Sequence, residues 1–322
     1  MPLPRSGDEL IQRIAARWRW YSYRVRFHPW TTHELPKILA GLLEYARLMR
    51  LDRPIGIWLL LWPTLWALWI AGRGKPKAMI FIIFVAGTVL MRSAGCAIND
   101  YADRSFDPRV KRTKNRPLAA GRISTLEALL LFSALSLSAL MLALQLNKST
   151  LLLAVGGGFL AISYPFVKRF LSVPQMYLGL TFGWGIPMAF EAQIEQVPRV
   201  ALLLLLANVL WVTVYDTMYA MVDRDDDIAI GVRSTAILFG DSDRHIIALL
   251  QAMTLLALYL VGRMLHMGYW YLAGLGAGAC FFIYQLWLIR ERDREGCFRA
   301  FLNNNYFGMS VFIGMALEYQ FL

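Results

Sequence analysis

Long apolar stretches dominate the pattern of hydrophobic and polar positions along the chain. A helix that crosses the hydrocarbon core of a bilayer needs about 20 mostly apolar residues. Nine stretches reach or approach that length, at residues 55–71, 78–98, 125–146, 150–164, 174–192, 200–222, 246–265, 269–289 and 301–321. The pattern therefore predicts an all-α, polytopic membrane protein built as a bundle of nine transmembrane helices.

Composition and charge agree with this pattern. Hydrophobic residues make up 57% of the 322 residues and charged residues 17%, whereas soluble domains average about 45–50% and 25%. The net charge of +11 would also suit a nucleic-acid partner, but most Lys and Arg residues lie in alternate loops, beginning with the N-terminal segment. Cytoplasmic loops carry such an excess, so a cytoplasmic N-terminus is predicted and no nucleic-acid partner is needed. Three cysteines are too few and too scattered for a disulfide framework or a zinc site.

The chain divides into a basic extension, residues 1–42, and a transmembrane domain, residues 43–322. The extension mixes arginines with Trp and Tyr residues, which is typical of an interfacial helix on anionic lipid. A mitochondrial transit peptide is the alternative because it is also Arg-rich, but Asp8, Glu9 and the scarcity of Ser count against it. We therefore predict a multi-pass protein of the bacterial inner membrane, with the mitochondrial inner membrane as the alternative.

An acidic segment follows the second predicted span, where residues 99–107 read NDYADRSFD. Residues i and i+4 lie on one face of a helix. Asn99, Asp103 and Asp107 would therefore form one ladder if the helix continues that far. Basic residues follow directly, namely Lys111, Arg112, Lys114 and Arg116.

A second acidic segment lies at the end of the sixth span, where residues 216–227 read DTMYAMVDRDDD. Asp216, Asp223 and Asp227 form a comparable ladder. Asp103 and Asp223 have the same sequence separation as Asp107 and Asp227, which indicates an internal duplication with two similar halves.

The two acidic segments together predict a magnesium site. A single acidic pair on a cytoplasmic loop is usually a solvated helix face. Like charges one turn apart repel, and proximity to the membrane raises that cost. Mg²⁺ would relieve the repulsion, since it prefers carboxylate and phosphate oxygens.

A third element follows the fourth span, where Tyr164, Lys168 and Arg169 occur in the sequence YPFVKR. Alone, it would be an ordinary basic cytoplasmic turn. Beside two acidic segments and a metal, these cations suit a diphosphate, whose departure from an apolar chain would leave an allylic carbocation. The spans would shield that cation from water.

Three runs of the sequence, residues 93–124, 163–170 and 215–240, closely resemble the UbiA superfamily of intramembrane aromatic prenyltransferases. Within it, the resemblance is strongest to the branch that prenylates 4-hydroxybenzoate in ubiquinone biosynthesis. It covers about residues 43–322, and the extension lies outside it. The resemblance implies a nine-helix bundle, a polyprenyl diphosphate donor, a 4-hydroxybenzoate acceptor and Mg²⁺ as cofactor.

The resemblance also implies roles for individual residues. The metal ligands are expected to be Asp103, Asp107, Asp223 and Asp227. Other members of the catalytic set are expected to be Asn99, Asp216 and Arg169. Substrate contacts are expected from Arg50, Arg53, Lys111, Arg112, Arg116, Tyr164 and Lys168. Arg50, Arg53 and Arg116 remain alternatives for binding an anionic group of a substrate, such as the acceptor carboxylate.

Several other functions remain as alternatives. Within the family, the acceptor could be a naphthoate, homogentisate or haem. A magnesium-dependent lipid phosphotransferase would require a DGxxAR sequence that is missing here. A cation-coupled transporter would place its carboxylates near the middle of the membrane, whereas both acidic segments lie at the cytoplasmic ends of spans.

Overall fold

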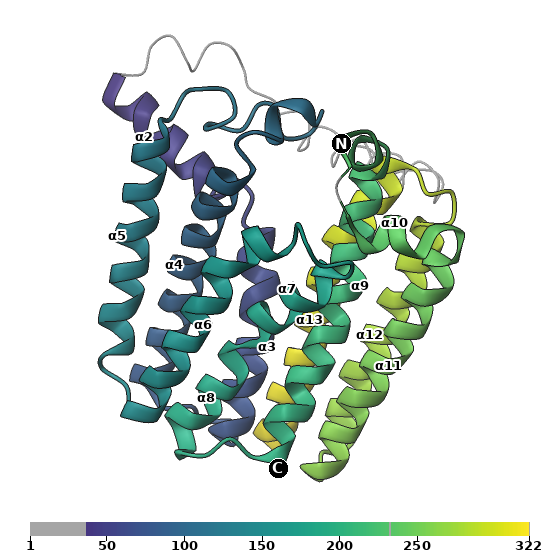
Figure 1. Ribbon diagram of the computed structural model, residues 1–322. Coiled ribbons are helices and arrows are strands. Elements are labelled where there is room, and N and C mark those ends of the chain that lie inside the picture. The colour runs from purple at the N-terminus through teal and green to yellow at the C-terminus, as the bar shows by residue number, and fades with distance from the viewer. Residues whose placement is uncertain (1–36, 232, 322) are drawn as a thin grey trace, which may run out of the picture. The chain divides into compact units, whose positions relative to one another are not determined.

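The computed structural model describes residues 37–231 and 233–321, and within these residues it contains helices and loops but no strand. The interfacial helix expected within residues 1–42 falls almost wholly outside this part. Two compact units are distinguished, residues 1–45 and 46–322. Helix α2 (Lys37–Leu48) crosses their boundary, and the second unit contains all the helices considered below (Figure 1).

Helices cover all of the predicted apolar stretches. In chain order they are α3 (Ile55–Ala71), α4 (Ala78–Asp103), α5 (Thr125–Ala143), α6 (Lys148–Val167), α7 (Pro174–Gly183), α8 (Gly185–Ile194), α9 (Arg199–Ile230), α11 (Asp243–Met264), α12 (Tyr269–Leu288) and α13 (Arg294–Phe321). Short helices η2 (Asp107–Arg109), α10 (Thr235–Phe239) and η3 (Gly240–Ser242) lie in the connections.

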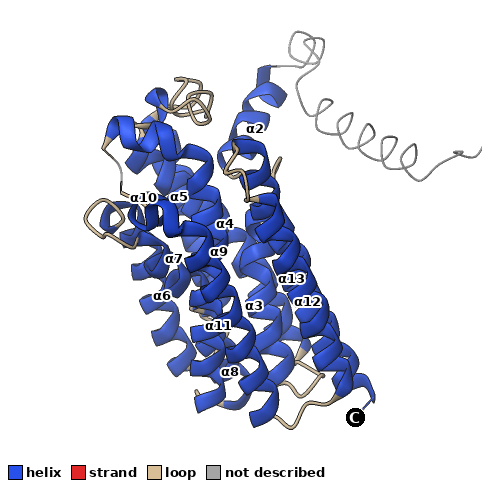
Figure 2. Cartoon of the chain, turned by 90° about the vertical axis from the view of Figure 1, so that its right-hand side faces the viewer, coloured by secondary structure: helices blue, strands red, loops and turns tan. Residues whose placement is uncertain are grey.

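Six helices of the described chain are long and apolar enough to cross a membrane, and α3 is a shorter apolar helix. The helices run roughly along one direction, so many of the connecting loops gather near two ends (Figure 2). An all-α, multi-pass membrane fold is thus confirmed. Nine crossings and two duplicated halves stay predictions that this arrangement accommodates.

The fifth predicted span is two helices rather than one. Helix α7 ends at Gly183 and α8 begins at Gly185. Pro187 has no backbone N–H, so it cannot donate to the carbonyl of Gly183 four residues earlier, and its ring crowds that carbonyl. The helix is interrupted at Trp184, whose indole N–H donates to the carbonyl of Leu153 in α6 at 2.7 Å.

Three consecutive asparagines on α13 connect this helix to three neighbours. Asn303 accepts from Gln285 of α12 at 3.1 Å, Asn304 from Trp211 of α9 at 2.9 Å, and Asn305 from Trp62 of α3 at 2.8 Å. Side-chain hydrogen bonds between helices are a common means of association where lipid removes the hydrophobic drive. They fix the position of α13 against three helices, one of which, α9, carries part of the site.

Helices α9 and α5 differ sharply in environment. In the most apolar window of α9, 67% of residues are buried inside the protein, compared with 6% in α5 and 11% in α6. Helix α9 is therefore central, whereas α5 and α6 present apolar side chains outward.

Candidate active site

The first acidic segment begins on α4 and leaves it. Helix α4 extends past the predicted span to Asp103, so Asn99 and Asp103 share a helical face as expected. Asp107 does not continue that ladder, because it starts the short helix η2. The reason is local: Pro108 follows Asp107, and a residue before proline is disfavoured in the α conformation. The prediction of a three-residue helical ladder is therefore wrong at Asp107.

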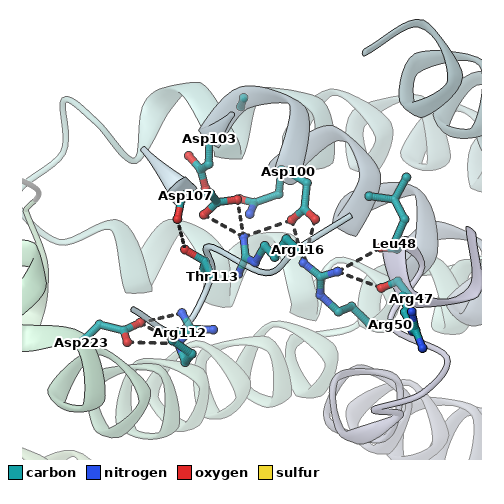
Figure 3. Close-up of polar contacts among 12 residues, drawn as sticks. Arg47, Leu48, Arg50, Asp100, Asp103, Asp107, Arg112, Thr113, Arg116 and Asp223 are labelled. Carbon is teal, nitrogen blue, oxygen red and sulfur yellow. Dashed lines mark hydrogen bonds and ion pairs between the residues drawn. The ribbon is translucent and has the colours of Figure 1, made fainter. Parts of the chain in front are cut away.

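Asp100 and Asp107 are joined by one arginine (Figure 3). Arg116 donates from Nη1 to Asp100 at 3.0 Å and to Asp107 at 2.9 Å. Arg50 donates from Nη2 to both oxygens of Asp100 at 2.8 Å. Burial raises the pKa of the Asp107 carboxyl, and the nearby Arg116 opposes that rise. Asp100 is 1% exposed, so these two arginines supply the charge that a buried carboxylate requires.

Lys168 connects the third element to the first acidic segment. Its Nζ donates to Asn99 Oδ1 at 2.8 Å and to Asp103 Oδ2 at 2.6 Å. Arg169 donates to the backbone carbonyl of Ala102, and its Nη2 lies 3.7 Å from Asp103 Oδ1. Lys168 also lies 5.9 Å from the ring centroid of Tyr164. The YPFVKR turn therefore places two cations on the end of α4.

Arg112 connects the first acidic segment to the second. Its Nε lies 3.0 and 2.9 Å from the two carboxylate oxygens of Asp223 in α9. The same guanidinium donates to the Tyr219 hydroxyl and lies over its ring, 4.6 Å from the centroid. A planar guanidinium matches a carboxylate through paired hydrogen bonds. Arg112 thus fixes the loop after α4 against the acidic end of α9.

Helix α9 remains unbroken through the second acidic segment, so Asp216, Asp223 and Asp227 do lie along one helical side. Lys168, which binds Asp103, also interacts electrostatically with Asp216 and Asp227. The two acidic segments therefore face a common region that contains Lys168 and Arg112.

Two predicted substrate contacts lie away from this region. Arg53 is 67% exposed and pairs with its neighbour Asp52 at 3.7 Å. Lys111 is exposed, beside the inward-facing Arg112. The structure therefore does not bring these two cations together with the other site residues, because both side chains face solvent.

Two residues at the site received no role from the sequence. Asp100 lies inside the NDYADRSFD run, but its two arginine partners come from distant turns. Arg92 lies in α4 and interacts electrostatically with Asp216 and Tyr164. Its Nε is buried without a hydrogen-bond partner in the part of the chain described. A role for Arg92 could have been predicted from the sequence, because a charged residue within an apolar span is usually functional.

The described residues offer carboxylate oxygens for a magnesium ion but no complete set of ligands. No group of three or more His, Cys, Asp or Glu side chains among the described residues is close enough to hold a metal by itself. The carboxylates of both segments nevertheless supply oxygen donors around one region. This set fits an ion that takes its remaining ligands from water and substrate phosphate, as Mg²⁺ usually does.

Comparison with known proteins agrees with the geometry. Residues 60–311 match the sequence model of the UbiA prenyltransferase family. The chain belongs to this family. Two UbiA-family relatives named 4-hydroxybenzoate octaprenyltransferase are similar to it. That of Nitrosococcus oceani is 59% identical over 278 residues, covering 86% of this chain and 98% of the relative. That of Marinobacter nauticus is 55% identical over 283 residues, covering 88% and 96%.

Solved UbiA structures share the fold. The apo structure of a UbiA homolog from Aeropyrum pernix K1 has a TM-score of 0.71 and 25% identity, covering 83% of this chain and 98% of that one. A UbiA homolog from Archaeoglobus fulgidus, solved bound to GPP and Mg²⁺, has a TM-score of 0.66 and 16% identity, covering 87% and 100%.

Proposed function

We propose that this UbiA-family chain transfers a polyprenyl group from polyprenyl diphosphate to 4-hydroxybenzoate, at the ring carbon ortho to the hydroxyl, in ubiquinone biosynthesis. The observation that carries this proposal is 59% identity to a 4-hydroxybenzoate octaprenyltransferase over nearly that relative's whole length. The convergence of acids and cations around Lys168 and Arg112 supports it, because such a set suits a diphosphate leaving group.

Mg²⁺ would be held by Asp103, Asp107, Asp223 and Asp227, and the bound ion would neutralise charge on the leaving diphosphate. Lys168 and Arg112 would exchange part of their contact with the carboxylates for contact with diphosphate oxygens. Arg169, 36% exposed beside Asp103, would add a third cation. Fixed charges of this kind stabilise a leaving group without reorganising during the reaction.

The acceptor would lie deeper, near Tyr164, Asn99 and Asp216. Of the arginines considered for its carboxylate, Arg50 and Arg116 already bind Asp100, and Arg53 faces solvent. Arg92 has a buried Nε without a hydrogen-bond partner among the described residues, and its charge interacts electrostatically with Asp216 and Tyr164. We therefore assign the acceptor carboxylate to Arg92, a residue that the sequence reasoning did not single out for this role.

The reaction would be an electrophilic aromatic substitution. The bond between the prenyl carbon and diphosphate oxygen breaks, leaving an allylic cation. The ring carbon beside the phenolic oxygen, meta to the carboxylate, bonds to that cation and then loses its proton. Asp216 or the diphosphate would receive the proton. The helices around the site would exclude the water that could otherwise capture the cation.

The site would face the cytoplasm of a bacterial cell. Both acidic segments and the YPFVKR turn adjoin connecting segments rich in Lys and Arg, and such segments remain on the cytoplasmic side. The protein would be a multi-pass component of the inner membrane, in contact with lipid and both substrates, with its N-terminus in the cytoplasm.

The test is to incubate membranes containing the protein with 4-hydroxybenzoate, a polyprenyl diphosphate and Mg²⁺, with and without chelator. We expect a product whose mass equals the acceptor plus the prenyl group minus one hydrogen, lost on chelation and restored by Mg²⁺. Parallel reactions with homogentisate and a dihydroxynaphthoate test the acceptor. Prenylation of another acceptor, with none of 4-hydroxybenzoate, would overturn the proposal.

A further inference from the structure

A second ion cluster lies behind the acidic end of α9, outside the site described above. Its centre is Asp243, the first residue of α11, which is fully buried. Arg292 donates to Asp243 from Nε at 3.1 Å to both oxygens and from Nη2 at 2.8 Å. Arg224 of α9 donates to the same carboxylate at 3.4 Å. A carboxylate can be buried this completely only where oppositely charged partners lie close to it.

The cluster joins three segments that are distant in the sequence. Arg224 follows Asp223 directly on α9, and Arg292 lies in the loop between α12 and α13. That loop is tightly shaped, since Arg292 has a left-handed backbone with φ of 55° and also donates to the carbonyl of Asp241 at 2.8 Å. Arg294, at the start of α13, binds Asp226 of α9 at 3.2 Å. Helix α11 packs against both α9 and α12, and all three lie on the same side of Figure 1.

Helix geometry relates this cluster to the site. Successive residues are turned by about 100° around a helix, so positions four apart share a side while adjacent positions do not. Asp223 and Asp227 share the side that meets Arg112 and Lys168, whereas Arg224 and Asp226 point in other directions. The end of α9 is therefore held on one side by Arg112, which binds Asp223. On other sides it is held by the contact of its own Arg224 with Asp243 and by Arg294, which binds Asp226.

We propose that Asp243, with Arg224 and Arg292, is a positioning cluster that fixes the rotation of the last turns of α9 and so aims Asp223 and Asp227 at the magnesium-diphosphate. None of the three is a catalytic residue, because they act through α9. This inference rests on the proposed function for its kinetic effect and on the geometry alone for its structural effect. Outer partners of metal ligands change metal affinity by roughly 10–100-fold, which sets the scale expected here.

The experiment compares two variants with opposite changes of charge. Asp243→Asn removes a negative charge, which by electrostatics alone would weaken binding of a divalent cation. Arg224→Gln removes a positive charge next to Asp223, which by electrostatics alone would strengthen it. The positioning cluster predicts that both variants raise the Mg²⁺ concentration for half-maximal activity and the KM for the prenyl diphosphate, by roughly 10-fold, with the KM for the aromatic acceptor unchanged.

A second measurement is independent of activity. Hydrogen exchange of the purified protein should show faster exchange at backbone amides 221–229 in both variants. Asp241→Asn is the matched control, since it removes the same charge from an exposed residue two positions away and should leave both measurements unchanged. Arg292→Lys keeps the charge. It should therefore raise the Mg²⁺ concentration for half-maximal activity less than Asp243→Asn does.

Three results separate the outcomes. Faster exchange at 221–229 with weakened Mg²⁺ use in both variants supports the positioning cluster. Faster exchange confined to the loops around 240–246 and 289–296, or opposite Mg²⁺ shifts in the two variants, overturns it. Absence of prenyl transfer by the wild-type protein with any acceptor would overturn the proposed function, and the exchange data would still decide whether the cluster orders α9.

Discussion

The two acidic segments resemble one another in sequence and differ in construction. The first leaves its helix at Asp103 and places Asp107 in η2. Four cations from three separate turns surround it and its neighbours. The second stays on an unbroken helix, α9, and its Asp223 binds one principal cation, Arg112. Equal spacing of aspartates along the chain has therefore produced two unlike local structures.

The difference indicates a division of work. The first segment is held by tertiary ion pairs, so its geometry depends on loops and on the residues that pair with Asp100. The second is held by helix geometry and by packing in the bundle, so its aspartates are displaced only if α9 turns or frays. The first segment should therefore respond to loss of charge partners, and the second to changes behind α9.

The largest effect is expected when either segment loses a metal ligand. Asp103→Ala and Asp223→Ala should each lower kcat at least about 10²–10³-fold, the range found when a group stabilising transition-state charge is removed. Product formation by membranes, normalised to inserted protein, measures this. Near-normal turnover in either variant would break the comparison by showing that one segment suffices.

Asp100→Asn should mainly reduce stability. Removing one partner of a buried ion pair costs roughly 3–5 kcal/mol, and Asp100 neutralises both Arg50 and Arg116. We expect a markedly lower unfolding temperature in detergent. The control is Asp52→Asn, whose side chain is 39% exposed beside Arg53 and should have little effect. An unchanged unfolding temperature for Asp100→Asn would show that the first segment does not depend on its ion pairs.

Lys168→Gln should have an intermediate effect. It removes charge-assisted hydrogen bonds to Asn99 and Asp103, each worth about 1.5–3 kcal/mol. We expect the KM for the prenyl diphosphate to rise about 10-fold or more, which corresponds to the lower value. Lys168→Arg should retain part of the function because the charge remains. If Lys168→Gln and the wild type have the same KM for the prenyl diphosphate, Lys168 does not contact the diphosphate.

The smallest effect is expected from deletion of residues 1–38, which lie before both segments. Since no site residue falls within them, kcat should stay within about twofold of the full-length value, a difference of about 0.4 kcal/mol in barrier. Loss of activity with normal membrane insertion would show that the extension contributes to catalysis.

Much of this fold follows directly from the sequence, because a bilayer imposes length and apolarity on every crossing. The interruption of the helix at Trp184 could be predicted from Pro187, and the departure of Asp107 from α4 could be predicted from Pro108. The pairing of Asp100 with Arg50 was not, since it requires the arrangement of two turns far apart in the chain. Asp243 gave even less signal, because its partner Arg292 owes its direction to a left-handed backbone.

The outward apolar sides of α5 and α6 carry a practical consequence. So few of their residues are buried inside the protein that the surrounding acyl chains, or the amphiphile that replaces them, supply most of the van der Waals contact on the outward sides. Exchanging one solubilising agent for another changes the contact partners of two whole helices. Thermal and kinetic constants of this enzyme therefore belong to a defined protein–amphiphile pair and are comparable only within it.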